Sequence, residues 1–147
     1  MNRGYACVGL DNPKDIFNIG AAARAVGCYK AAFLAVSGTR ASHRLNHIAT
    51  DTQKTIRHTP FLKVDDLKNI IPHNCVPVAV DLVPEAKDLT NYSHPERAFY
   101  IFGAEDATLG DRVLSWCRDI IYIPTQGCMN LAATVNVVLY DRMIKNK

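Results

Sequence analysis

The sequence predicts a single α/β domain built on a mainly parallel β-sheet with helices on both faces. Short apolar runs recur along the chain, and several are continuous rather than alternating, as strands buried on both sides should be. Helical patterns separate these runs, which is what crossover connections between parallel strands require. The chain has 147 residues, enough for one core, so residues 1–147 are expected to form one domain.

The elements follow in chain order. The expected strands are short and rich in β-branched and aromatic residues, and they cover residues 5–10, 32–36, 76–81, 99–102 and 120–123. The expected helices between them have apolar residues at helical spacing, and they cover residues 16–26, 43–50, 64–71 and 109–117. Strand and helix therefore alternate along most of the chain.

A final helix is predicted over residues 130–144, and it is apolar on more than one face. One face carries Leu131, Val135, Val138 and Leu139, and another carries Ala133, Val137, Tyr140 and Ile144. A helix of this kind needs burial on both faces. It can be a central core helix or a helix shared with a second subunit, and the pattern leaves both open.

The composition is that of a globular protein from a reducing compartment. Hydrophobic residues make up 48% and charged residues 21%, close to the average for soluble domains. Lys and Arg number 17 against 14 Asp and Glu, a balance that permits a nucleic-acid partner without requiring one. Five cysteines without a C-x-x-C pair support neither a disulfide framework nor a zinc site. We expect a cytoplasmic protein with no metal and, because no apolar run is long enough, no membrane span.

Several enzyme classes lack their motifs in this chain. There is no G-x-G-x-x-G, no Walker-type phosphate loop, no G-x-S-x-G and no H-E-x-x-H. The sequence therefore argues against dinucleotide enzymes, nucleotide triphosphatases, serine hydrolases and zincins.

A run of Gly and Ala follows the opening strand and lies between Asn18 and Arg24. Residues this small let a helix approach a sheet or a neighbouring chain closely. On its own chemistry, Arg24 could equally be an ordinary surface or ion-pairing residue.

Two further motifs stand where predicted strands end. The strand at 99–102 leads into Gly103-Ala104-Glu105, and ligands bind at the carboxyl ends of strands in open α/β sheets. Acidic residues also favour the start of an ordinary helix, so this motif alone decides nothing. The strand at 120–123 leads through a polar loop to Asn130, which could simply be the N-cap of the last helix.

The order of the three motifs is more specific than any one of them. Asn-x-Gly-x-x-x-Arg, Phe-Gly-x-Glu and Ile-Pro followed by Asn-Leu resemble the three signature motifs of the SpoU/TrmH branch of the SPOUT RNA methyltransferases. The resemblance extends from Asn12 to Tyr140, nearly the whole chain. The Cys-Met-Asn-Leu-Ala-Ala-Thr-Val run is most similar to the minimal single-domain tRNA (ribose-2′-O)-methyltransferases.

The resemblance implies a fold, an activity and an assembly. It implies an α/β domain whose C-terminal segment forms a deep trefoil knot, acting as a homodimer. It also implies transfer of a methyl group from S-adenosylmethionine to a ribose 2′-hydroxyl of tRNA, in the anticodon loop by analogy with minimal members. The alternatives are 2′-O-methylation of rRNA, a catalytically weak RNA-binding module on the same scaffold, and an unrelated α/β enzyme that binds another nucleotide.

Motif matching also assigns site residues. The catalytic set is Arg24, Asn18, Glu105 and Asn130, with Asn18 and Glu105 orienting Arg24. A guanidinium is normally a permanent cation, so Arg24 could act as a base or as a positioning group. The residues expected to bind S-adenosylmethionine are Val80, Asp81, Leu82, Phe102, Gly103, Ile123, Cys128, Met129 and Leu131. Cys128 departs from the family, where Ser is usual, and a serine hydroxyl role there would put cofactor affinity in doubt.

RNA contact is expected on a basic stretch that follows the second strand. Its members are Arg40, Arg44, Lys54 and Arg57, together with His43, His47 and His58. Basic side chains at helical spacing can neutralise phosphates, although a solvated helix face has the same pattern.

Overall fold

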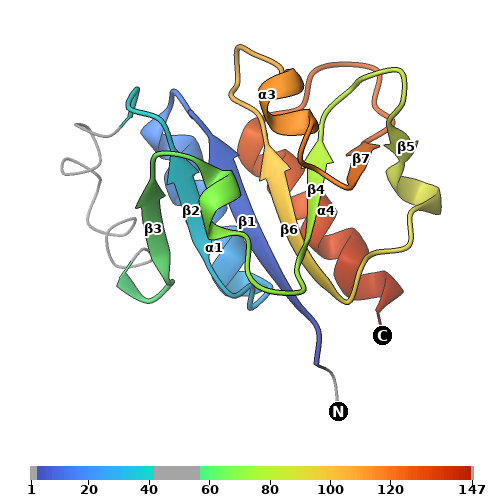
Figure 1. Cartoon of the computed structure of the whole chain (residues 1–147), viewed down its shortest axis with the longest axis horizontal. Coiled ribbons are helices and arrows are strands. Elements are labelled where there is room, and N and C mark those ends of the chain that lie inside the picture. Colours follow the sequence, from blue (N-terminus) through green and yellow to red (C-terminus); the bar gives the residue numbers. More distant parts are fainter. Residues whose placement is uncertain (1–2, 42–56, 147) are drawn as a thin grey trace.

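The computed structural model describes residues 3–41 and 57–146 (Figure 1). Within these ranges the chain forms a seven-stranded sheet in the order β3-β2-β1-β6-β4-β7-β5. Every strand pair in it is parallel, which confirms the predicted sheet type. The strands are β1 (Tyr5–Asp11), β2 (Leu34–Ser37), β3 (Phe61–Val64), β4 (Val76–Val80), β5 (Lys87–Asp88), β6 (Arg97–Phe102) and β7 (Asp119–Tyr122).

Helices cover both faces of the sheet, as predicted. The two long helices, α1 (Ile16–Cys28) and α4 (Leu131–Lys145), pack together on one face. The other face carries the 3-10 helix η2 (Leu67–Ile70) and the single turn α3 (Asp111–Leu114) (Figure 1). A second 3-10 helix, η3 (Leu89–Asn91), follows β5.

The continuous apolar strands are explained by a core on each side of the sheet. Along β6, Tyr100 and Phe102 belong to the cluster beneath α1 and α4. The alternate residues Phe99 and Ile101 belong to the cluster beneath η2 and α3. All four side chains are buried, so neither face of the strand can be polar.

Two predicted helices are shorter in the structure, and one lies outside it. The helix expected over 64–71 is wrong over its first half, because Val64 ends β3 and Asp66 caps η2 through a 3.1 Å bond from the Lys68 amide. The helix expected over 109–117 is helical only at Asp111–Leu114. The helix expected over 43–50 lies outside the described residues.

Strands β3 and β5 were not predicted from the sequence. Strand β3 is half exposed and carries Lys63, so it has no continuous apolar run. Strand β5 has two residues and, among the described strands, pairs only with β7. Both are edge strands, which pack on fewer neighbours and so need fewer apolar side chains.

One of the two apolar faces that the sequence predicts for α4 is buried in the chain, and the other is open. Val135, Val138 and Leu139 are buried against α1 and the sheet. On the other side, Tyr140 is 52% exposed and Ile144 is 42% exposed. Within one chain α4 is therefore buried on a single face.

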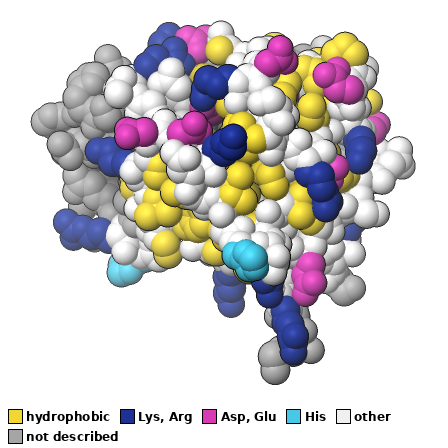
Figure 2. Space-filling view, viewed as in Figure 1, with side chains coloured by type: hydrophobic (Ala, Val, Ile, Leu, Met, Phe, Trp, Pro, Cys, Tyr) yellow, Lys and Arg dark blue, Asp and Glu magenta, His cyan; other side chains and the backbone are white. Residues whose placement is uncertain are grey.

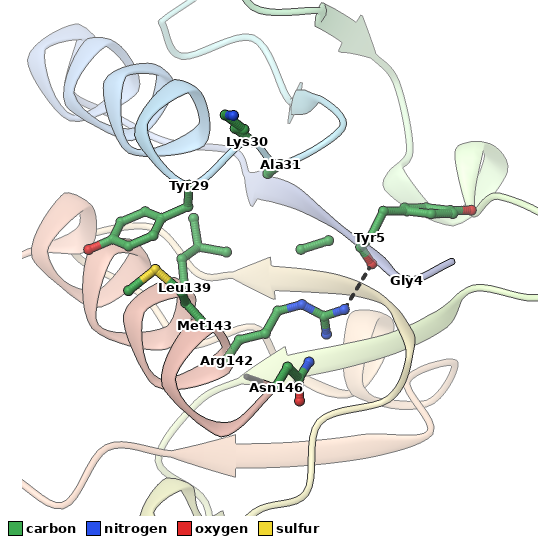
Figure 3. A pocket seen from close by; sticks show the side chains of 10 residues that line it. Gly4, Tyr5, Tyr29, Lys30, Ala31, Leu139, Arg142, Met143 and Asn146 are labelled. Carbon is green, nitrogen blue, oxygen red and sulfur yellow. Dashed lines mark hydrogen bonds between the residues drawn. The ribbon is translucent and has the colours of Figure 1, made fainter. Parts of the chain in front are cut away.

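A buried arginine fastens the end of α4 to the sheet. Figure 3 shows Arg142 reaching from α4 toward the start of β1, where it donates to the Tyr5 carbonyl at 3.3 Å. It also donates to the carbonyls of Pro95 and Glu96, both at 2.7 Å, and to the Tyr100 hydroxyl at 3.0 Å. These bonds satisfy a charge that would be costly to bury alone.

His94 extends this polar cluster. Its Nδ1 lies 2.6 Å from the Tyr100 hydroxyl and its Nε2 lies 2.7 Å from Asp141 Oδ2. Because that hydroxyl already accepts from Arg142, it can donate to Nδ1, and the Nε2 proton then points to Asp141. The cluster fixes α4 at the amino-terminal edge of the sheet, far from the motif residues at the other edge.

Candidate active site

Three of the predicted catalytic residues are joined by side-chain hydrogen bonds. Asn18 donates through Nδ2 to Glu105 Oε1 at 3.0 Å. Asn130 donates through Nδ2 to Asn18 Oδ1, also at 3.0 Å. One residue from each motif therefore takes part, from α1, from the loop after β6 and from the start of α4. We refer to Asn18, Glu105 and Asn130 as the motif triad.

Glu105 is held as an anion by several donors. The backbone amides of Lys14 and Asp15 donate to its carboxylate at 3.0 and 3.4 Å. Burial alone would raise the pKa of Glu105, but hydrogen bonds from backbone amides and from Asn18 outweigh it and lower that pKa below its ordinary value. The loop before α1 and the loop after β6 are therefore tied together through one negative charge.

Asn130 has two roles at once. Its Oδ1 accepts from the Ala133 amide at 3.1 Å, which makes it the N-cap of α4. The N-cap interpretation from the sequence is thus confirmed. Its Nδ2 remains free to bond Asn18, so the cap also sets where α4 begins relative to α1.

A cavity of about 140 Å³ lies beside the motif triad, at the carboxyl ends of β4 and β6. It is lined by six of the nine residues expected to bind S-adenosylmethionine, which are Val80, Asp81, Phe102, Gly103, Met129 and Leu131. Glu105, Ala104, Ala107 and Thr134 complete the lining. Leu82, Ile123 and Cys128 do not line it, and Leu82 is 77% exposed. We call this space the cofactor cavity, after the residues that the sequence led us to expect at S-adenosylmethionine; that assignment stays a prediction.

The walls of the cofactor cavity are held by Asp81 and Gly103. The Asp81 carboxylate accepts from the amides of Leu82 at 2.9 Å and Leu109 at 3.1 Å, which joins the loops after β4 and β6. At Gly103 a Cβ would stand 3.2 Å from the Ala107 carbonyl oxygen, a tight contact with backbone. The position favours glycine because a side chain would press on the cavity wall.

The lining suits S-adenosylmethionine chemically. Val80, Phe102 and Leu131 supply apolar surface for an adenosine group. Asp81 and Glu105 supply negative charge, and none of the lining residues in the described part of the chain is a Lys or Arg. A ligand that carries a sulfonium cation is favoured by such a set.

Arg24 lies on a different surface. It lines a cavity of about 410 Å³ over α1 and α4 together with Phe17, Gly20, Ala21, Ala25, Cys28 and Asn136. This cavity and the cofactor cavity share no lining residue. Within residues 3–41 and 57–146, the Arg24 side chain makes no hydrogen bond or ion pair, so its orientation by Asn18 and Glu105 stays a prediction.

The basic stretch is only partly described. Arg44 and Lys54 lie outside the described residues, as do His43 and His47. Arg57 and His58 are exposed. Arg40 bonds both oxygens of Asp106 at 2.9 Å and the Asn12 carbonyl at 3.0 Å. RNA contact by these residues stays a prediction.

Sequence reasoning missed two charged groups at this edge of the sheet. Asp11 ends β1 and accepts from Arg112 of α3 at 2.7 Å and from the Ser37 hydroxyl at 3.1 Å. Asp11 is buried. Its position at the end of an apolar strand was the only feature of the sequence that could have marked it as a functional residue. Arg112 stood in a segment predicted as a plain helix, so no pattern marked it.

Comparison with known proteins identifies the family. A profile of the SpoU rRNA Methylase family matches residues 5–140. The chain belongs to this family. Its members are RNA methyltransferases that use S-adenosylmethionine, so the resemblance seen in the sequence and the predicted cofactor are confirmed.

Solved structures share the fold at low sequence identity. The TrmH/SpoU tRNA modifying enzyme of A. aeolicus superposes with a TM-score of 0.81 at 18% identity, over 99% of this chain and 77% of that one. AviRb from Streptomyces viridochromogenes, in complex with AdoMet, gives 0.82 at 18% identity over 99% of this chain and 59% of its own. A structure reported for the 2-OH methylation of C/U34 on tRNA gives 0.78 at 18% identity, over 97% of both chains.

These relatives differ in length. The chain spans less than two thirds of AviRb and of several other matched structures. No curated protein matches the sequence.

Within the described ranges no helix is both long enough and apolar enough to cross a membrane. The same residues hold no group of three or more His, Cys, Asp or Glu side chains suited to a metal ion.

Proposed function

We propose that this protein transfers a methyl group from S-adenosylmethionine to a ribose 2′-hydroxyl of tRNA in the cytoplasm. The observation that carries the proposal is the motif triad, in which one residue of each signature motif bonds the next beside the cofactor cavity. When bound, S-adenosylmethionine supplies an activated methyl carbon. The chain's part is to hold that carbon and the hydroxyl oxygen in line.

The cofactor cavity must widen to receive its ligand. Its volume of about 140 Å³ is below the roughly 300–1,000 Å³ that ligand sites usually have. The segment 124–128 is exposed, and Gly127 has open space around it. We expect this segment to move outward when the ligand binds, which would bring Ile123 and Cys128 into contact with it.

A homodimer would place Arg24 beside the cofactor cavity of the partner subunit. The cavity that Arg24 lines also holds Phe17, which is 75% exposed, and Asn136; Tyr140, one helical turn after Asn136 on α4, is 52% exposed. Large apolar side chains at this exposure favour a second copy as the covering partner. Because Arg24 lines no part of its own chain's cofactor cavity, we propose that it serves the cavity of the partner.

The trefoil knot belongs to the same proposal. Strand β7 lies between β4 and β5 in the sheet although both precede it in the chain. A segment that enters between two earlier neighbours has the kind of crossing that a knot needs. The chain then continues directly into α4 through Asn130.

The choice of tRNA has separate support. The structure reported for methylation of C/U34 on tRNA superposes on this chain over 97% of both chains, so the two folds correspond along almost their whole given lengths. A small domain suits an exposed loop, where the 2′-hydroxyl of an unpaired nucleotide is accessible. The anticodon loop is therefore our preferred site, with rRNA as the second candidate because of the family's name.

The direct test is transfer of labelled methyl from S-adenosylmethionine to total tRNA and to rRNA, followed by mass spectrometry of the nucleosides. A 2′-O-methylated nucleoside in tRNA is expected. A base-methylated product would overturn the ribose assignment. Cofactor binding without any transfer would favour the RNA-binding module, which the Cys128 departure leaves open.

Arg24→Ala tests the catalytic assignment. We expect transfer to fall by at least about 100-fold, in the range of a positioned catalytic group, with the fold unchanged because Arg24 is exposed. Lys30→Ala, which removes an exposed cation near the end of α1, is the matched control and should keep full activity. Unchanged turnover in Arg24→Ala would remove this residue from the mechanism.

Mixed dimers test whether the site is shared. Met129→Trp fills the cofactor cavity of one subunit, and Arg24→Ala removes the arginine of the other. Each variant alone should be inactive. Co-expression should restore about a quarter of wild-type activity, because half of the random dimers are mixed and one of their two symmetric sites is intact. No recovery would place Arg24 and the cofactor in the same chain.

A further inference from the structure

A second cavity lies beside the cofactor cavity and has a different chemistry. Its volume is about 390 Å³, and Asp11, Asn12, Arg40, Asp106 and Arg112 are among its lining residues. Ala104 and Ala107 line both cavities, so the segment after β6 forms part of the wall of each. Figure 2 shows basic and acidic side chains mixed along this edge of the molecule, above the carboxyl ends of the strands.

The charges in this second cavity are already paired. Arg40 bonds Asp106, and Arg112 bonds Asp11. The two guanidinium groups and two carboxylates balance, so a phosphate entering the cavity would meet carboxylates as well as arginines. A nucleobase suits it better, because a base edge presents both donors and acceptors.

Two residues of the cavity have hydrogen-bonding groups to spare. Arg112 uses one terminal nitrogen for Asp11, at 2.7 Å, and within the described part of the chain its other N–H groups bond nothing. The Asn12 side-chain amide likewise makes no hydrogen bond to a described residue. Arg40, in contrast, has all three nitrogens engaged with Asp106 and the Asn12 carbonyl.

The groups with spare donors are held in place. Asn12 has a φ of +51°, and the Arg40 guanidinium donates a hydrogen bond to its carbonyl at 3.0 Å. Its amide rests against Gly38, where a Cβ would stand 2.1 Å from the Asn12 Oδ1. Asp11 is held by the Ser37 hydroxyl at 3.1 Å and in turn orients Arg112. A fixed donor discriminates better than a mobile one, because less side-chain freedom is lost when it binds.

We propose that this second cavity receives the base of an RNA nucleotide adjacent to the methylated one, and that Arg112 and Asn12 discriminate between bases there. The proposal rests on the function proposed above and names how its substrate is chosen. A ribose at the cofactor cavity leaves its neighbour's base within reach of the second cavity, because Ala104 and Ala107 form the shared wall. Asp11 and Arg40 are positioning residues.

The test uses anticodon-arm stem-loops that carry each of the four bases in turn at every loop position. Binding is measured by fluorescence anisotropy and methyl transfer by label incorporation, on the same RNAs. Arg112→Lys keeps the charge but loses the planar fork, so it should reduce the preference among bases at one position by about 10-fold, the scale of one good base contact. Asn12→Gly, which keeps the backbone conformation, should reduce the preference at the same position.

Arg118→Lys is the matched control. The Arg118 side chain is 60% exposed and paired with an aspartate at 3.2 Å, against 63% and 2.7 Å for Arg112, but it lies away from both cavities. It should leave binding, transfer and base preference at wild-type values. S-adenosylmethionine affinity, measured by calorimetry, should be unchanged in all three variants.

The outcomes separate the two proposals. If Arg112→Lys keeps the wild-type base preference, the second cavity does not discriminate between bases, and the methyltransferase proposal still stands. A uniform loss for all four bases, with a shallower salt dependence, would mean a phosphate contact and would also overturn it. Base discrimination in binding without any methyl transfer would support the cavity and overturn the proposed activity.

Discussion

Asn18 is the bridge of the motif triad, and replacing it with alanine should loosen three elements together. Its side chain is buried, donates to the Glu105 carboxylate and accepts from Asn130, both at 3.0 Å. A bond to a charged group contributes roughly 1.5–3 kcal/mol and a neutral one roughly 0.5–1.5 kcal/mol. Glu105 is solvent-exposed and keeps the Lys14 and Asp15 amides, so the lower end applies, about 2 kcal/mol.

This loss can be measured in two ways. For a chain of this size, about 2 kcal/mol lowers the Tm by roughly 4–8 °C. S-adenosylmethionine affinity should also weaken, because the loop after β6 and the start of α4 border the cofactor cavity and would no longer be joined. Scanning calorimetry and titration calorimetry on the same samples give both values.

Asn69→Ala is the control for Asn18→Ala. Asn69 is exposed in η2, and its side chain makes no hydrogen bond within the described ranges, so its removal should cost less than about 0.5 kcal/mol. If Asn18→Ala melts like Asn69→Ala and binds the cofactor as the wild type does, the motif triad does not hold the site together.

Asn18→Asp separates charge from shape. The new carboxylate can still accept from Asn130, but it faces Glu105, and two carboxylates at this distance cannot both ionise at low cost. The folded state would then raise one carboxyl pKa above its unfolded value. The variant should be close to wild-type stability below about pH 4, the ordinary range for carboxyl groups, and lose stability as the pH rises. Equal destabilisation at all pH values would contradict the bond between Asn18 and Glu105.

Three further changes have defined outcomes. Burial lowers the pKa of His94 despite the Asp141 carboxylate, so the folded state favours the neutral ring. The free energy of unfolding should therefore fall as the pH drops below about 6.5. In urea titrations, the stabilities of wild type and His94→Gln should converge in acid. Gly9→Ala places a Cβ 2.7 Å from a Phe99 ring atom and should cost about 1–3 kcal/mol in thermal unfolding, whereas Gly127→Ala, with nothing within 4 Å, should be neutral. Cys128→Ser should change S-adenosylmethionine affinity by less than about 3-fold in titration calorimetry, because the exposed Cys128 can make the expected ligand contact through its backbone, which the change to serine keeps; a larger gain would show that the serine hydroxyl matters.

The central strands were predictable because buried strands consist mostly of apolar residues, and such runs are visible in the sequence. β1, β4 and β6 are buried on both faces, and a strand in that setting is apolar along most of its length, with polar residues such as Asp11 and Arg97 only at its ends. The edge strands β3 and β5 escaped prediction for the opposite reason, since an exposed edge accepts polar residues such as Lys63.

The membership of the site was predictable, but its connections were not. The motifs named Asn18, Glu105 and Asn130, yet the bonds between them link residues 87 and 112 positions apart. Periodicity reports on contacts within an element and carries no information about which loops meet. The separation of Arg24 from the cofactor cavity is equally a property of which face of α1 turns inward.

By itself, the sequence determined the α/β class, the family and the identity of the motif residues, because these depend on local pattern and on residue order. Only the tertiary structure decided that the motif triad is one hydrogen-bonded unit, that α4 exposes a second apolar face, and that Arg112 stands beside Asn12 in a second cavity. Parallel pairing brings the carboxyl ends of strands from distant parts of the chain together at one edge of the sheet. A pattern along the sequence does not show which of these ends become neighbours.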